Sequence, residues 1–599
     1  MCGNKCYELR KSLSFGLSAA VFVLLNTVVY SIACSQQVVS PVSPESAATA
    51  VEVSIAINPV NIDNIVAGSL MRGYPESEEP DFSFWSKDGG KTYTAVPVPN
   101  PDDRTQGDDV VLFAGGGMCV HAFITFTGLW DAAPKRASNG IAIVRSNDGG
   151  ETWGDQTPVI DHTNSKSPME DKPWLVFDRN TRSPHHGNLY CSWTRFDVYG
   201  SDDPQDTSQI MFATSRDGGE SFEPVIRLSD AGGDCKDDDG TLEGATPSVG
   251  PDGSVYVVWA GPRGLEFDKS TDGGKTFGTD RVIGDIAGGW SSDVAGIQRH
   301  NGMPVTGVDH SQGTNRGRLY VNWIDDRNGN KDVFLISSAD GGETWSERVQ
   351  VNEASTDNGR DQFFTWMAVD PVDGSVNIAY YDRAKTEGTM TGLTLARSLD
   401  GKTFQHFPVD VPAFKCQANV FFGDYIGIDA QQGRVAIGFM QFQKDGRLGL
   451  SSAVFDFQPN SLDLIEHGSR MAGQPNRITV QHILVGFEGS IPDKAISRSK
   501  MEAEQLATDL LTRARAGEDF DALVKEFTDD EHPGIYQMAN FNSVPDMSPE
   551  ETADKVFPRG GMVRAFGDVG FSLEVGDVGV TEYSASKSKY GWHVIKRIK

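Results

Sequence analysis

One eight-residue pattern recurs along this chain and constrains its fold more than any other feature of the sequence. Its fullest copy runs from Ser338 to Trp345 and reads Ser-x-Asp-Gly-Gly-x-Thr-Trp. Successive copies lie about sixty residues apart, and a fixed period of that length indicates an architecture built from similar structural units. The six copies span residues 86–93, 146–153, 215–222, 270–277, 338–345 and 398–404, and the last of them lacks one glycine.

Each copy predicts a tight turn between two strands. Glycine adopts positive φ at no steric cost, and an aspartate side chain accepts hydrogen bonds from the backbone that follows it. Strand-like runs surround every copy, as in Trp174–Phe177, Leu189–Thr194, Ile210–Thr214 and Val225–Leu228. Four short strands in each repeat predict the blade of a β-propeller.

The repeated pattern resembles the Asp box, or BNR repeat, of sialidase-like β-propellers. The resemblance implies an all-β propeller over residues 51–458, with the aspartates in structural turns at the blade periphery. Three more strand-like runs, Tyr425–Asp429, Arg434–Met440 and Leu448–Phe455, follow the last copy. We therefore expect seven blades, the last completed by a strand from the N-terminal segment, with six blades as the alternative.

The first 34 residues resemble a signal for export. Basic residues precede an apolar run from Leu13 to Ala33, and Ser31–Cys34 resembles a bacterial lipobox with Cys34 as the lipidated residue. We expect an outer-membrane lipoprotein that faces the periplasm or the cell surface, with residues 35–50 as a tether. An uncleaved anchor, or a plain secretory peptide cut elsewhere, is the alternative.

Charge and cysteine content narrow the function further. The formal charge of −30 excludes nucleic acid as a partner, because phosphate binding needs a basic surface. Four cysteines follow the signal segment, and Cys235 and Cys416 lie in loop-like runs where they are candidates for a disulfide. No spacing of residues predicts a metal site.

The blade pattern ends at a linker, residues 459–476, and residues 477–599 predict an α+β domain. A strand at Ile478–Val485 precedes an amphipathic helix at Ser499–Ala516 and a shorter helix at Phe520–Phe527. We expect one face of the first helix to be apolar. That face comprises Met501, Leu506, Leu510 and Leu511.

This C-terminal region resembles the parvulin-type (PpiC) peptidyl-prolyl cis–trans isomerases. The matching segments are Gln481–Val485, Phe520–Leu523, Phe527–Asp530, Gly561–Phe566, Phe571–Leu573, Val575–Val578 and Tyr590–Lys596. The resemblance implies catalytic residues His482, Asp530 and His593, and a proline pocket formed by Met562 and Phe566. It implies proline-containing proteins or peptides as substrates and no cofactor.

The chemistry required of such a site is modest. The two X–Pro isomers differ by only about 0.5–1 kcal/mol, so a catalyst needs only to stabilise the twisted amide more than the planar one. One segment departs from the family, because Pro533–Asn540 replaces its Gly-Gly-Asp-Leu-Gly. Ile535 or Met538 is then the candidate for the family's leucine, and the activity of the domain stays open. A non-catalytic peptide-holding domain is the alternative.

Arginines recur after inner strands of the propeller and are candidates for a ligand site. Equivalent positions on successive blades would direct them to one mouth of the ring, where a glycan or peptide could bind; ion pairs between blades are the other interpretation. The sialidase motif Phe/Tyr-Arg-Ile-Pro is absent, so a glycoside hydrolase is the weaker hypothesis. The candidate residues are Arg195, Arg327, Arg383, Asp326 and Asp382, with Glu170, Asp171 and Lys172 beside them.

The sequence as a whole predicts an exported prolyl isomerase that assists folding of envelope proteins, with a propeller that binds or scaffolds.

Overall fold

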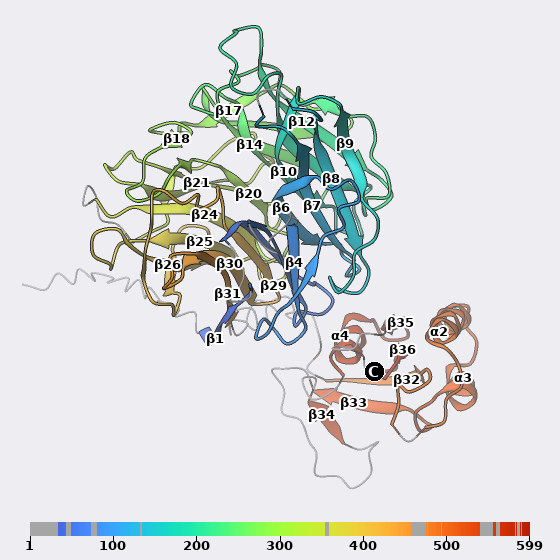
Figure 1. Cartoon of the computed structure of the whole chain (residues 1–599). Helices are drawn as coiled ribbons and strands as arrows, with labels where there is room; N and C mark the ends of the chain where they lie inside the picture. The colour runs from blue at the N-terminus through green and yellow to red at the C-terminus, as the bar shows by residue number, and fades with distance from the viewer. Residues whose placement is uncertain are drawn as a thin grey trace, which may run out of the picture.

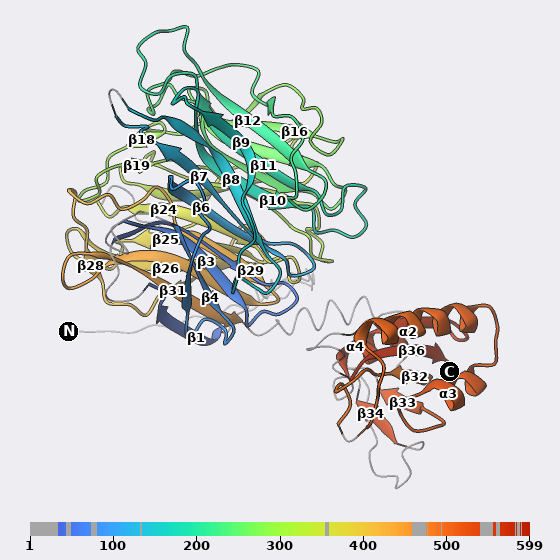
Figure 2. The ribbon, with the colours of Figure 1, turned by 45° about the vertical axis from the view of Figure 1, so that its right-hand side comes forward.

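A computed structural model describes most of the chain as two regions, a large ring of sheets and a smaller α+β body (Figures 1 and 2). The described residues are 34–43, 49–72, 81–131, 134–353, 359–457, 475, 477–492, 494–539, 555–558, 563–581, 583, 588 and 590–599. Residues 1–33 of the predicted signal segment and Met562 lie outside them. No helix in these ranges is long and apolar enough to span a membrane.

Seven antiparallel sheets, six of four strands and one of five, make up the ring in the described part of residues 34–457. In the first six, the strands stand in chain order, and the first strand of each lines the ring axis. Each sheet is therefore one propeller blade. The first three blades are β2 (Thr49–Ile57), β3 (Ile65–Arg72), β4 (Asp81–Ser86) and β5 (Thr94–Pro97); β6 (Thr105–Phe113), β7 (Cys119–Thr127), β8 (Ser138–Ser146) and β9 (Thr157–Thr163); and β10 (Met169–Phe177), β11 (Leu189–Phe196), β12 (Ser208–Ser215) and β13 (Ile226–Arg227).

The next three blades have the same order, and a small hairpin is inserted after the first of them. They are β14 (Glu243–Val249), β15 (Val255–Gly261), β16 (Gly264–Ser270) and β17 (Arg281–Gly284); β20 (Val305–Val308), β21 (Leu319–Asp325), β22 (Asp332–Ser338) and β23 (Val349–Gln350); and β24 (Gln362–Val369), β25 (Val376–Asp382), β26 (Met390–Ser398) and β27 (Gln405–Pro408). The hairpin is β18 (Ser291–Ser292) with β19 (His300–Asn301), and β28 (Phe414–Lys415) pairs with β26.

The seventh blade closes the ring by joining the two ends of the propeller. Its strands β29 (Gly427–Gln431), β30 (Arg434–Phe442) and β31 (Leu448–Phe457) leave one edge open, and β1 (Cys34–Pro41) pairs antiparallel with that edge. This confirms the seven-blade prediction. The prediction of a tether at residues 35–50 is wrong for residues 35–41, which belong to β1. The unpaired edge of β31 offers backbone hydrogen bonds, and this segment pairs with it despite its Ser and Pro residues.

The repeated turns fix neighbouring blades to one another. The Asp340 carboxylate accepts hydrogen bonds from the Ser338 hydroxyl at 2.7 Å and from the Thr344 amide at 2.9 Å. Gly342 has φ +89°, and a Cβ there would lie 2.4 Å from the ring of Phe267 in the preceding blade. The turn therefore requires glycine both for its conformation and for the close approach between blades.

The inner strands carry bulges that turn charged side chains toward the ring axis. Glu52, Asp108 and Lys172 occupy equivalent bulges in β2, β6 and β10, with φ of 55°, 54° and 50°. A left-handed non-glycine residue costs about 1 kcal/mol or more, and such strain concentrates at functional positions. Further along the strands, Trp174 and Trp366 pack across the axis with ring centroids 4.3 Å apart.

The C-terminal region is a five-stranded sheet of order β34-β33-β32-β36-β35. One face packs on α2 and α3 through Ile483 and Val594, and the other packs on α4 through Val480 and Ile595. The elements are β32 (Arg477–Val485), α2 (Lys500–Arg515), α3 (Phe520–Phe527), β33 (Ile535–Ala539), β34 (Val556–Pro558), α4 (Arg564–Ser572), β35 (Val578–Thr581) and β36 (Trp592–Arg597).

Two predictions about packing are wrong. Met501 is 74% exposed, because α2 buries its small residues Ala503 and Ala507 together with Leu510 against the sheet. Leu506 and Leu511 also pack against this core, so Met501 alone of the four predicted residues lies off the buried face. Cys235 and Cys416 are both free and buried, so they form no disulfide.

Candidate active site of the C-terminal region

Two histidines face each other on the α4 side of the sheet. His482 on β32 pairs in register with Ile595, so His593 on β36 lies diagonally across from it on the same face. Their Nδ1 atoms are 3.1 Å apart, and both side chains are nearly fully buried. The paired histidines that the sequence predicted are therefore brought together by strand register alone.

A chain of hydrogen bonds fixes which nitrogens carry protons. Asp530 accepts from His482 Nε2 at 3.0 Å and from the Tyr536 hydroxyl at 3.0 Å. When both rings are neutral, His482 Nδ1 is an acceptor, so His593 Nδ1–H must donate to it. His593 Nε2 is then left with a lone pair, and this buried atom has no hydrogen-bond partner among the described residues.

Burial and charge hold this arrangement in one protonation state. The hydrogen bond from His482 lowers the pKa of Asp530 to about 2, so the carboxylate is ionised at neutral pH. Burial, with the neighbouring His482 ring, lowers the pKa of His593 to about 3, so this imidazole stays neutral. Burial next to Asp530 raises the pKa of Tyr536.

A cavity of about 250 Å³ opens beside the two histidines. Phe566 on α4 stands edge-on to both rings, with centroids 4.9 Å from His482 and 5.4 Å from His593. Phe566 is thus placed as the apolar wall that the sequence predicted for a proline ring. The remaining lining residues are Leu484, Ile491, Asp530, Tyr536, Val563 and Tyr590.

The divergent segment contributes a residue that sequence reasoning missed. Neither Ile535 nor Met538 lines the cavity, and Met538 is instead fully buried in the core beneath α4. Tyr536 occupies the position, and its ring centroid lies 5.3 Å from His482. Successive side chains of a strand point to opposite faces, so Tyr536 and Met538 lie on the same face of β33. This alternation could have indicated Tyr536 as a residue of the cavity, with Met538 in the core beside it.

Comparison with known proteins agrees with this geometry. Residues 465–598 match the family model described as PPIC-type PPIASE domain. The C-terminal region is a PPIC-type PPIase domain. Such a domain indicates peptidyl-prolyl cis–trans isomerase activity, and the cavity beside the two histidines lies within it. No match was found among curated proteins.

The ring is similar to several solved structures at low identity. A protein of unknown function from Dyadobacter fermentans is 12% identical over 71% of this chain and 99% of its own, with a TM-score of 0.39. An α-L-arabinanase from Penicillium chrysogenum is 12% identical over 70% of this chain and 98% of its own, with a TM-score of 0.39. The NanB sialidase from Streptococcus pneumoniae is 12% identical over 70% of each chain, with a TM-score of 0.37. Similarity at this level supports no inference about activity.

The neutral His593 predicts a loss of stability of the isomerase domain in mild acid. An unfolded histidine takes up a proton below its ordinary pKa of about 6.5, whereas the folded domain excludes that proton down to a pKa of about 3. Between pH 6.5 and pH 4 the free energy of unfolding should therefore fall by roughly 2–3 kcal/mol. Hydrogen exchange of the β36 amides, followed by mass spectrometry across this pH range, measures the change. His593→Asn should remove most of this slope, and an unchanged slope in that variant would contradict the assignment.

The predicted propeller residues are each held by neighbours in or beside their own blade. Arg195 donates to Glu170 at 2.8 Å, and Arg327 donates to Asp325 at 2.8 Å. Arg383 is 2% exposed and donates to Thr391 and to the Ala295 carbonyl. Asp326 pairs with Lys331, and Asp382 accepts from Gln362 and Thr394. Among the described residues, no hydrogen bond or ion pair joins any two of these five predicted residues.

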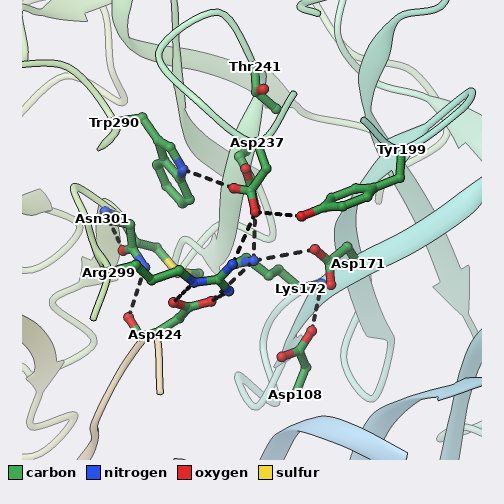
Figure 3. A network of polar contacts seen from close by, with 12 residues as sticks. Asp108, Asp171, Lys172, Tyr199, Asp237, Thr241, Trp290, Arg299, Asn301 and Asp424 are labelled. Carbon is green, nitrogen blue, oxygen red and sulfur yellow. Dashed lines mark hydrogen bonds and ion pairs between the residues drawn. The ribbon is translucent and has the colours of Figure 1, made fainter. Parts of the chain in front are cut away.

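A different set of charged residues meets at the ring axis (Figure 3). The Lys172 ammonium, only 3% exposed, lies 2.9 Å from Glu243 and 3.3 Å from both Asp171 and Asp424. Arg299, beside the inserted hairpin, pairs with Asp424 and with Asp237. The six carboxyl groups of this axial cluster outnumber its two cations. They belong to Glu52, Asp108, Asp171, Asp237, Glu243 and Asp424.

Carboxyl groups of the axial cluster differ in the direction in which their pKa is shifted. Burial raises the pKa of Glu52, Asp108 and Asp171 to about 7, and neighbouring acids add to the effect. Burial also acts on Asp424, but Lys172 and Arg299 outweigh it and lower its pKa to about 2. In the described part of the chain, no group of three His, Cys, Asp or Glu side chains could hold a metal ion.

Most of the axial cluster was not predicted from the sequence. Only Asp171 and Lys172 were named, as neighbours of the arginines. The missed acids have a common position, because Glu52, Asp108 and Glu243 each lie within the first four residues of an inner strand. Arg299 and Asp424 have no such position, since they lie outside the strands on segments that differ between blades.

Proposed function

We propose that this protein is an exported peptidyl-prolyl cis–trans isomerase that acts on proline-containing segments of envelope proteins. The observation that carries the proposal is the cavity in which Phe566 stands over the His482–His593 pair. An apolar cavity of about 250 Å³ accommodates a proline ring with its preceding peptide bond. The export signal and the lipobox resemblance at Cys34 support the location.

The geometry favours catalysis by the environment and not by proton transfer. Resonance gives the planar amide a large dipole, and this resonance is lost when the X–Pro bond twists. An apolar wall such as Phe566 therefore favours the twisted amide over the planar one, which is the differential binding that catalysis requires. Because Asp530 fixes the tautomers of both histidines, the polar edge of the site keeps one orientation throughout the rotation.

The test is the rate of cis–trans exchange in a peptide with one X–Pro bond, measured by NMR exchange spectroscopy with the full chain present. We expect exchange far faster than the unaided process, which takes tens to hundreds of seconds. Peptide binding without acceleration would instead support the non-catalytic peptide-holding function. Absence of both would exclude this site as a proline-binding site.

Asp530→Asn is expected to lower kcat/KM for this exchange by about tenfold. The amide cannot accept from both His482 and Tyr536 with the strength of a carboxylate, so the orientation of the histidine pair loosens. The NMR exchange rate measures the loss. Asp509→Asn, on the exposed side of α2, is the matched control and should leave the rate unchanged.

For the propeller we propose a binding role toward a glycan or peptide. The supporting observation is an exposed aromatic group beside the axial cluster. Trp130 is 64% exposed and packs edge-on against Tyr199, whose hydroxyl donates to Asp237. A large exposed aromatic residue next to polar groups is typical of a binding surface. A glycan or peptide array probed with the full chain and with Trp130→Ala tests this role.

A further inference from the structure

A second cavity lies on the ring axis and is separate from both sites described above. It has a volume of about 440 Å³ and is lined by all seven inner strands of the propeller. Its lining residues follow the axial cluster along the same strands, so it occupies the opposite part of the axis. Trp174 and Trp366 line it and pack with Tyr425, at centroid distances of 5.4 and 5.6 Å.

Arg179 is a cation of this cavity that has no bonding partner. It follows β10, and its guanidinium makes no hydrogen bond or ion pair with any described residue. Burial lowers its pKa, and the charge of Asp429 offsets this in part. Both Asp429 oxygens are already engaged by backbone amides, those of Ile57 and Ala430, each at 2.8 Å. Arg179 is half-buried, and its five N–H donors find no acceptor among the described residues, so a ligand bound in the cavity would supply one.

The charge balance of the cavity favours an anion. Its formally charged lining residues are Arg179, Arg316 and Asp429, which leaves an excess of one positive charge. His310 adds none, because burial lowers its pKa and its Nε2–H donates to the Val249 carbonyl at 2.7 Å. A net positive cavity in a chain of formal charge −30 is unlike the protein as a whole.

The wall of the cavity is mixed, with polar residues such as Thr246, Ser248 and Thr306 among the valine, isoleucine and leucine residues of the inner strands. Its inner end is aromatic, because the Trp174–Trp366 pair lies there. A guanidinium binds a carboxylate through two parallel N–H donors, and aromatic residues stack on planar rings. We propose that this cavity binds a small organic carboxylate, with its carboxylate on Arg179 and its apolar or aromatic body toward Trp174 and Trp366.

The carboxylate could come from a free organic acid or from the C-terminus of a peptide. Isothermal titration of the full chain with 2-naphthoate tests the first source, and the tripeptide Ala-Ala-Phe tests the second. We expect one of the two to bind. We also expect Arg179→Gln, or the neutral amide of the same compound, to weaken binding at least about tenfold.

Arg182→Gln is the matched control, because Arg182 is an exposed arginine three positions further along the same loop and does not line the cavity. It should leave binding unchanged. Equal affinity of Arg179→Gln and the unmodified protein, or equal binding of acid and amide, would overturn the proposal. Failure of both carboxylates to bind would overturn it as well. Thermal unfolding of each variant separates lost binding from lost folding.

Discussion

Lys172→Met is expected to lower the free energy of unfolding of the propeller by about 3–5 kcal/mol at pH 8. The Lys172 ammonium is the buried counter-ion of Asp171, Glu243 and Asp424, and methionine fills its volume without its charge. Removing one partner of a buried ion pair leaves the others charged and desolvated. Hydrogen exchange of the inner strand β10 and thermal unfolding both measure this loss.

The loss from Lys172→Met should shrink as the pH falls. Glu52, Asp108 and Asp171 already have a pKa of about 7, above their unfolded values, so protonation of the folded form stabilises it. That stabilising contribution is present below about pH 4 and is lost as the pH rises through 7. Without Lys172 these pKa values rise further, so the defect is largest at pH 8 and smallest near pH 5.

Lys331→Met is the matched control for this variant. Lys331 is also largely buried, but its carboxylate partner Asp326 is 40% exposed and can be solvated alone. We therefore expect a loss of about 1 kcal/mol or less. Equal losses of unfolding free energy in the two variants would show that the loss comes from the buried aliphatic part of the lysine and not from the charges of the axial cluster. Lys172→Arg should retain part of the stability if charge is the cause.

Phe566→Ala is expected to lower kcat/KM for X–Pro exchange by about 10- to 100-fold. The phenyl ring is 2% exposed and forms the wall over the histidine pair, so its removal takes away the apolar surface against a proline ring. NMR exchange spectroscopy with the full chain measures the rate. Phe566→Leu keeps much of the apolar surface, so its kcat/KM should lie between those of the unmodified protein and Phe566→Ala.

Phe571→Ala controls for the damage that Phe566→Ala does to the core. Phe571 lies on the same helix and in the same buried core, but it does not line the cavity. Both substitutions should lower stability, by about 3–5 kcal/mol for each phenylalanine lost from a core. Only Phe566→Ala should lower the exchange rate in the fraction that stays folded. A similar loss of rate in both would assign the effect to the core alone.

The regular parts of the fold could be predicted from the sequence because their causes are local. The turn at Ser338–Trp345 forms from contacts within a few residues, so its six copies mark the blades directly. Helix α2 begins where expected because Ser499 and Glu502 form a reciprocal cap, again within one turn. One residue of its predicted apolar face, Met501, is instead exposed, because the side chains that face the sheet depend on how closely the sheet approaches.

The residues around the C-terminal cavity could be predicted in part for the same reason. His482, Asp530, Phe566 and His593 lie in recognisable local segments, and the structure brings them together around one cavity. Tyr536 could not be foreseen, since it belongs to the segment where the family pattern is absent. Met562 lies outside the described residues, so its role stays a prediction.

The sequence by itself determined the blade units, the α+β region and the pair of histidines, since each depends on contacts between residues close in the chain or on a local motif. Only the tertiary structure decided how the ring closes and what occupies its axis. β1 pairs with β31 across more than four hundred residues, and Lys172 meets Asp424 only because blades three and seven face the same axis. All seven inner strands line the axial cavity, so no single blade forms it. Closure of the ring is therefore the physical event that creates both the axial cluster and the cavity around Arg179.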